Sequence, residues 1–162
     1  MLNLSEKHGM IRMIAEKIAN EKVAPRAKEI DSTGAFPWDL VDVFKKQGFL
    51  YLMLPERFGG LDGDITSLCL VIEELAKVSG ASSLIPLAHN VGLMPIMVAA
   101  NDEQRECVYS KVADPDKMNL VAFALTEPDA GSDASHMRTS VTKDGQYYYL
   151  NGKKSMITNG AN

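Results

Sequence analysis

Residues 123–133 hold the densest group of side chains in this sequence that could do chemistry. They read Phe-Ala-Leu-Thr-Glu-Pro-Asp-Ala-Gly-Ser-Asp, an apolar stretch ending in Thr126, a turn at Pro128, and a small-residue loop around Gly131 and Ser132. Such a loop exposes backbone N–H groups and hydroxyls in a concave arrangement that can hold a phosphate or the polar edge of a ring. A tight strand–loop connection, whose Ser and Asp satisfy only their own backbone, explains the same residues.

A second segment, residues 151–160, reads Asn-Gly-Lys-Lys-Ser-Met-Ile-Thr-Asn-Gly. By itself it indicates a hairpin turn that leads into a strand and then into another turn. The two segments become a candidate ligand site only when they are taken together, at this spacing and after a long helical stretch.

Most of the other ionisable residues are better explained by structure than by catalysis. Glu73 and Glu74 are neighbours on a predicted helix and point about 100° apart, so we interpret them as a solvated helix edge. Glu127 and Asp129 are expected to cap and to form turns. His89 lies in an apolar tract and is expected to be a core histidine whose ring is satisfied by a neighbour. We therefore assign no catalytic residue and no metal ligand.

The elements that must position these residues change in kind near residue 118. Before it, apolar residues recur at helical spacing, as at Ile11, Ile14, Ala15 and Ile18. This spacing predicts amphipathic helices that are buried against one another. The first helix is expected to be kinked or ended by Pro25. Predicted helices cover residues 5–22, 37–48, 64–77, 82–100 and 102–112, with a weak continuation of the first to residue 31.

After residue 116 the pattern favours short strands joined by tight turns. The turn signals are Lys143-Asp144-Gly145 and Asn151-Gly152. Predicted strands cover residues 120–125, 137–142, 146–150 and 153–158, and residues 50–54 are also extended in character. The predicted fold is therefore mainly α: an orthogonal bundle of about five to six helices over residues 1–118, followed by a truncated antiparallel β domain over residues 119–162.

The composition is that of an ordinary folded protein, with 46% hydrophobic and 23% charged residues and a net charge of −4. Without a basic footprint, nucleic acid is not an expected partner. No uninterrupted apolar run reaches the ~18 residues of a spanning helix, so no membrane association is expected. The N-terminal residues lack a secretion signal, and we expect a cytoplasmic protein. The two cysteines have no metal-ligand spacing and are expected to be buried free thiols.

Both segments, together with residues 55–60 and the stretch Ala88-His89-Asn90, resemble the acyl-CoA dehydrogenase family. The resemblance covers essentially the whole chain. Residues 125–133 are a highly specific family signature, and Ile157-Thr158-Asn159 is the second one. The family's helical N-terminal domain, followed by a β domain, matches the change of pattern near residue 118.

This resemblance implies a flavoprotein that binds FAD. Thr126 is implied to reach the polar edge of the flavin ring, and Ser132 also to touch the CoA-bearing substrate. Met156 stands where the family usually has Trp, so an aromatic wall beside the flavin is missing. The flexible Met side chain fills only part of that space. The implied cofactor-binding residues are Phe123, Leu125, Thr126, Gly131, Ser132, Met156, Ile157 and Thr158.

The implied reaction is the oxidation of an acyl-CoA to the trans-2-enoyl-CoA. In the family a C-terminal Glu removes the α-proton while the β-hydride passes to FAD, and the electrons then pass to an electron-transfer flavoprotein. No residue of this chain matches that Glu, so the chain alone is expected to be inactive, and the full-length enzyme is expected to form a homo-tetramer or homo-dimer. The alternatives are an enoyl-CoA reductase or acyl-CoA oxidase of the same architecture, or a non-catalytic helical interaction module.

Overall fold

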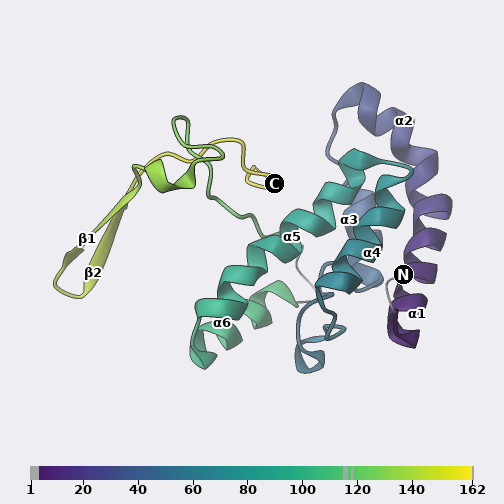
Figure 1. The fold of residues 1–162 in the computed structure, drawn as a ribbon, viewed down its shortest axis with the longest axis horizontal. Helices are drawn as coiled ribbons and strands as arrows, with labels where there is room; N and C mark the ends of the chain where they lie inside the picture. Colours follow the sequence, from purple (N-terminus) through teal and green to yellow (C-terminus); the bar gives the residue numbers. More distant parts are fainter. Residues whose placement is uncertain (1–3, 115–116, 118, 162) are drawn as a thin grey trace.

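A computed structural model describes residues 4–114, 117 and 119–161 (Figure 1). Six α-helices are followed by one antiparallel hairpin, as the predicted mainly α fold class requires, and that prediction is confirmed. The predicted domain boundary at residue 118 lies outside the described residues. The elements are α1 (Glu6–Ile18), α2 (Ala24–Thr33), α3 (Trp38–Lys46), α4 (Ile65–Ala76), α5 (Gly80–Ala99), α6 (Asp102–Val112), β1 (Ser140–Asp144) and β2 (Tyr147–Asn151).

Pro25 does not end the first helix, and the predicted continuation to residue 31 is present and runs to Thr33. α1 passes into a π-helical turn, Ala19–Val23, and continues as α2, which has Pro25 in its first turn. A proline lacks the backbone N–H that an α-helix interior needs, and the widened turn before it removes the conflict. α2 then ends at Gly34, whose φ of 66° is the left-handed conformation that glycine adopts without steric cost.

Residues 50–54 form buried turns and no strand, so the predicted extended run is wrong. The Tyr51 N–H bonds to the carbonyl of Gly48, and the carbonyl of Leu52 accepts the N–H of Gly63. Local turns therefore satisfy the backbone, and the apolar side chains are used to fill the core: Leu50, Leu52 and Leu54 are all buried.

A buried carboxylate joins α1 to α4. Glu74 is 2% exposed and accepts hydrogen bonds from Arg12 of α1, at 2.7 Å, and from Lys77. Burial by itself would raise the pKa of Glu74, but the hydrogen bonds of Lys77 and Arg12 lower it on balance. The predicted solvated edge therefore holds for Glu73, which is exposed, and is wrong for Glu74.

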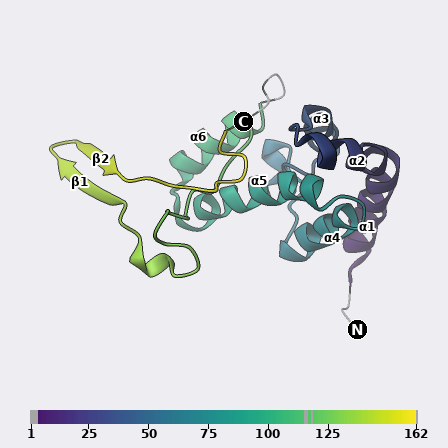
Figure 2. The same cartoon turned by 90° about the horizontal axis from the view of Figure 1, so that it is seen from above.

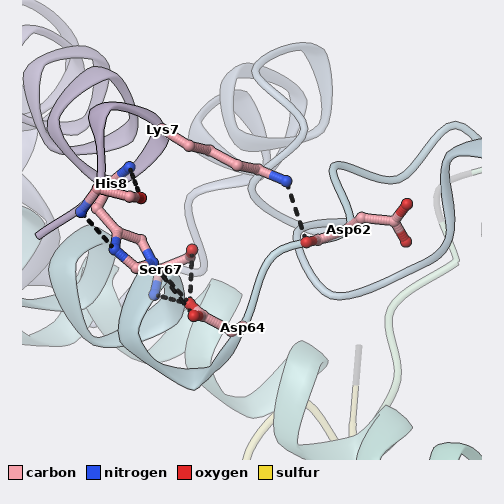
Figure 3. Close-up of polar contacts among 6 residues, drawn as sticks. Lys7, His8, Asp62, Asp64 and Ser67 are labelled. Carbon is pink, nitrogen blue, oxygen red and sulfur yellow. Dashed lines mark hydrogen bonds and ion pairs between the residues drawn. The ribbon is translucent and has the colours of Figure 1, made fainter.

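A second set of polar contacts joins the start of α1 to the loop before α4 (Figure 3). Ser5 caps α1, and the Nδ1 of His8 accepts the Ser5 N–H, so a neutral His8 ring carries its proton on Nε2. That Nε2 lies 3.0 Å from a carboxylate oxygen of Asp64, which is the N-cap of α4. The N–H and hydroxyl of Ser67, and then His8, lower the pKa of Asp64 to about 2. Two helix starts are thus fixed to each other.

α5 is the one helix of the described residues that is long and apolar enough to span a membrane. It packs against α4, and it carries the buried polar residues His89 and Asn90. The Asn90 amide donates to the carbonyls of Phe49 and Pro86, both at 2.8 Å. A core helix passes the same test of length and composition, and these buried contacts are those of a core helix.

Only one pair of the predicted strands forms within the described residues. β1 and β2 pair antiparallel with Val141 opposite Leu150, and Gly145, at φ 59°, makes the turn. The hairpin projects away from the helices (Figures 1 and 2). Residues 120–125 and 153–158 belong to no strand, contrary to prediction, because their backbone groups bond to side chains and turns instead of to a neighbouring strand.

The predicted burial of the two cysteines is also wrong. Cys69 and Cys107 are free thiols, as predicted, but both are exposed. They lie on the outer faces of α4 and α6, where helical spacing alone does not show which side meets the core.

Candidate functional site

A cavity of about 310 Å³ lies between α5 and the two segments that were singled out as a candidate ligand site. The first segment contributes Phe123, Leu125 and Thr126. The second segment contributes its own short run, Met156, Ile157 and Thr158. Residues about 30 positions apart in sequence therefore share one wall, and six of the eight predicted cofactor-binding residues are brought together.

The opposite wall is a face of α5 that the sequence analysis missed, apart from Ala88. Leu84, Leu87, Ala88 and Val91 line the cavity. Their i, i+3, i+4, i+7 spacing places them on one side of the helix. The signal was present in the sequence, but α5 is apolar nearly all round, so spacing alone did not distinguish the cavity face from the core face.

Gly131 and Ser132 do not line this cavity. Both are exposed, and they follow a tight turn closed by two backbone hydrogen bonds between Glu127 and Ala130. Nearby, the carboxylate of Asp133 contacts the hydroxyl of Ser135 and the ring of His136. The loop is thus held by its own polar side chains beside the cavity.

The chain just before the first segment is held against α5 by the buried His89, and Gly92 allows its close approach. The Val121 N–H donates to the Nδ1 of His89, at 3.1 Å, and the Val121 carbonyl accepts from the amide of Asn159, at 3.4 Å. A Cβ on Gly92 would lie 2.6 Å from Cγ1 of Val121, so the close approach requires glycine. These contacts place residues 123–126 where they can form the wall.

His89 is a buried core residue, as the sequence analysis expected. Its Nδ1 is partnered, whereas its Nε2 has no hydrogen-bond partner among the described residues. Burial lowers the pKa of His89 to about 4, so the ring is neutral at pH 7. A neutral ring that accepts at Nδ1 carries its proton on Nε2.

Glu127 belongs to the first segment, but its side chain is buried and does not line the cavity. It accepts hydrogen bonds from Lys154, from the N–H groups of Arg138 and Thr139, and from the Thr139 hydroxyl. Lys154 and then Thr139 and Arg138 lower the pKa of Glu127 to about 2. It is therefore a permanently charged structural residue at neutral pH. Asp129, by contrast, is exposed and pairs with Arg138 on the surface.

The chemistry of the lining suits a flat, largely apolar group with one polar edge. Eight of the ten lining side chains are apolar, and the hydroxyls of Thr126 and Thr158 provide the hydrogen-bonding groups. Phe123, Leu125 and Met156 stay partly or largely exposed, as expected of a surface that another group covers. None of the lining side chains takes up or releases a proton near pH 7. The cavity can bind and orient such a group, but its lining supplies no acid or base.

Met156 has an unusual backbone for a residue of its type. Its φ is 54°, in the left-handed region, and its side chain is 87% exposed. This conformation costs about 1 kcal/mol for a residue with a Cβ. It turns the side chain out at the mouth of the cavity, at the position where the resemblance leads one to expect Trp.

Two family descriptions match the chain. Residues 5–116 match "Acyl-CoA dehydrogenase, N-terminal domain", and residues 122–162 match "Acyl-CoA dehydrogenase, middle domain". Among curated proteins, a probable acyl-CoA dehydrogenase of Mycobacterium tuberculosis, FadE25, is 36% identical over 99% of this chain and 41% of its own length. A 3-(aryl)acrylate reductase of Clostridium sporogenes is 35% identical over 95% of this chain and 41% of its own length.

Solved structures agree with these matches. Butyryl-CoA dehydrogenase from Megasphaera elsdenii superposes with a TM-score of 0.86 at 33% identity, over 99% of this chain and 43% of the other. A chain in a structure titled for the electron transferring flavoprotein of Acidaminococcus fermentans superposes with a TM-score of 0.87 at 35% identity, over 99% and 42%. This chain therefore spans about two fifths of the length of the proteins it matches.

Proposed function

This chain belongs to the acyl-CoA dehydrogenase family, and on that premise we propose that it supplies the helical domain and one side of the FAD site of a flavin-dependent acyl-CoA dehydrogenase. The reaction would oxidise an acyl-CoA to the trans-2-enoyl-CoA. FAD, when bound, would supply the two-electron acceptor for that oxidation.

One observation carries the proposal: two segments about 30 residues apart meet over α5 to form a single apolar cavity with two hydroxyls. In the proposed site, Phe123, Leu125 and Ile157 hold the flat apolar ring and exclude water from it. The hydroxyls of Thr126 and Thr158 bond to its polar edge. Met156 stands at the mouth in place of the family's Trp and covers it only in part. Gly131 and Ser132 bind the cofactor outside this cavity, and Ser132 also contacts the CoA-bearing substrate.

Filling the cavity tests this proposal directly. Ala88→Trp places an indole on the α5 face of the cavity, and Ala76→Trp places the same side chain on the exposed end of α4. In the full-length protein we expect Ala88→Trp to weaken FAD binding at least tenfold and Ala76→Trp to leave it unchanged. Flavin fluorescence quenching measures both. An unsubstituted full-length protein that purifies without flavin absorbance and does not take up FAD would favour a non-catalytic interaction module.

We propose further that these 162 residues do not turn over acyl-CoA by themselves. The α-proton of a thioester must be removed by a base, and no side chain lining the cavity can accept a proton at neutral pH. Mixing the chain with FAD and an acyl-CoA should leave the flavin absorbance unbleached. Bleaching would show that a base is present in this chain after all.

An enoyl-CoA reductase is the second candidate, and the similarity to the 3-(aryl)acrylate reductase favours it. The two directions separate in one assay of the full-length protein. A dehydrogenase reduces an artificial acceptor with acyl-CoA as donor, and a reductase consumes an enoyl-CoA with a reduced donor. Oxygen-dependent turnover would instead indicate an acyl-CoA oxidase.

We also propose an electron-transfer flavoprotein as the physiological acceptor, a homo-tetramer or homo-dimer as the assembly and the cytoplasm as the location. The similarity to a chain in the structure titled for the electron transferring flavoprotein of Acidaminococcus fermentans supports the first of these. When a purified electron-transfer flavoprotein is added to the full-length protein with acyl-CoA, the flavin of the electron-transfer flavoprotein should become reduced.

A further inference from the structure

We infer that Glu127 and Lys154 form a positioning pair that holds together the two segments of the cavity wall, residues 123–126 and residues 156–158. Neither member lines the cavity, and the pair acts through the residues that do. The inference deepens the proposed function, because the wall that the pair sets is the proposed flavin wall.

Glu127, the first member of the pair, has a carboxylate whose two oxygens both accept hydrogen bonds. Glu127 is 5% exposed, and its Oε2 accepts the N–H of Arg138 at 2.7 Å. Its Oε1 accepts the N–H of Thr139 at 3.0 Å and the Nζ of Lys154 at 2.8 Å, together with the Thr139 hydroxyl. One side chain thus joins the first segment, the chain leading into β1, and the second segment.

The second half of the pair reaches back to the wall itself. The Nζ of Lys154 also donates to the carbonyl of Leu125, at 2.9 Å, and the N–H of the next residue, Ser155, donates to the carbonyl of Thr126, at 3.0 Å. Leu125 and Thr126 line the cavity, and Met156 follows Ser155 directly. These bonds therefore set how far apart the two lining runs lie.

The Lys154 side chain and a single backbone hydrogen bond set this spacing because no strand ladder does. Residues 120–125 and 153–158 are in no sheet within the described part of the chain, so their register is not fixed by repeated backbone pairing. The carboxylate and ammonium are a charge-assisted pair whose lysine side chain is only 23% exposed, which makes the contact stronger and less screened than a surface ion pair.

Five substitutions in the full-length protein test the pair. Lys154→Met removes the ammonium and keeps the aliphatic stem, and Lys153→Met is the matched control at the exposed neighbouring lysine. Glu127→Gln leaves one acceptor oxygen where four donors converge, so it should behave like Lys154→Met. Glu74→Gln weakens a buried ion pair on α4 and controls for general loss of stability.

We expect Lys154→Met and Glu127→Gln to weaken FAD binding at least tenfold and to shift the visible flavin bands. Lys153→Met should change neither, and Glu74→Gln should lower the Tm without moving the bands. Lys154→Arg, which keeps the charge and the donors, should restore most of the affinity. A Lys154→Met protein that loses Tm but binds FAD within twofold of Lys153→Met would overturn the inference.

A second measurement keeps the test independent of flavin. The Ser155 amide donates to the Thr126 carbonyl, so its hydrogen exchange reports how readily this bond between the two segments opens. Lys154→Met should speed that exchange at least tenfold, and Lys153→Met should not. If the unsubstituted protein binds no FAD, the proposed function fails, and the exchange of the Ser155 amide still decides whether the pair positions the segments.

Discussion

At the scale of single residues, burial has changed the chemistry of His89. The ring lies inside the helical domain, with its Nδ1 bonded to the Val121 N–H. Burial lowers the pKa from 6.5 to about 4, because the charged form would lose its hydration without gaining a partner. His89 is therefore a fixed acceptor for the segment that leads into the cavity wall, and it should stay one down to mildly acid pH.

This shift predicts a pH dependence of folding. Between pH 4 and pH 6.5 the unfolded chain binds a proton at His89 that the folded chain does not, so the free energy of unfolding falls as the pH drops through this window. Above pH 6.5 the neutral His89 ring costs the folded chain no stability. Between pH 7 and pH 5 the free energy of unfolding falls by about 2 kcal/mol because of His89.

His89→Gln isolates that contribution, because the Gln oxygen can accept the Val121 N–H and does not titrate. Urea unfolding at pH 7 and pH 5 should show the unsubstituted chain losing about 2 kcal/mol more than the variant. His8 and His136 are present in both proteins and cancel. Equal losses in the two proteins would mean that His89 takes up its proton in the folded state.

At the scale of elements, the contact between α5 and the segment after it depends on a missing side chain. Gly92 lies on α5 where Val121 crosses it, and a Cβ there would be 2.6 Å from Cγ1 of Val121. Gly9 on α1 is the opposite case, since a Cβ there would have no atom within 4 Å. Replacing glycine by alanine should thus change the stability of the chain in opposite directions at Gly9 and at Gly92.

We expect Gly9→Ala to stabilise the chain by about 0.5–1 kcal/mol, because alanine costs less backbone entropy in a helix. Gly92→Ala should destabilise it by about 1–3 kcal/mol through overpacking. Thermal unfolding measures both. The double variant Gly92→Ala, Val121→Ala should recover part of the loss, and a Gly92→Ala protein as stable as Gly9→Ala would contradict the close approach.

At the scale of the whole molecule, the chain divides into a well-packed part and an exposed part. Buried side chains from α1 to α5, among them Val23, Phe44, Leu52 and Leu75, form one core cluster. Every residue of β1 and β2 is exposed, including Val141 and the aromatic run of β2. A hairpin of two strands is marginally stable by itself.

Hydrogen exchange should therefore separate the two parts. In the 162-residue chain, the amides of β1 and β2 should exchange fastest among the paired amides and those of α4 and α5 slowest, because opening the hairpin exposes no core. Mass spectrometry of peptides after timed labelling measures this. Equal protection of hairpin and helices would show that the hairpin is covered.

The helices were predictable because their signals are local. Ser5, Asp64 and Asn101 each bond to a backbone N–H three residues on, and these caps mark where α1, α4 and α6 begin. The strands proposed at residues 120–125 and 153–158 were wrong because a strand needs a partner, which sequence patterns do not identify. The burial of Glu74 was missed for the same reason: Arg12, its partner, lies on another helix.

The sequence by itself determined the helical class and the starts of α1, α4 and α6, since spacing and capping act within a few residues, and it singled out the two segments as a candidate ligand site. Only the tertiary structure decided which face of α5 meets those segments, that Gly131 and Ser132 lie outside the cavity, and that Glu127 and Lys154 join its wall. Those facts depend on contacts between residues far apart in the chain. Such contacts are set by the packing of the whole molecule and leave no periodic trace in the sequence.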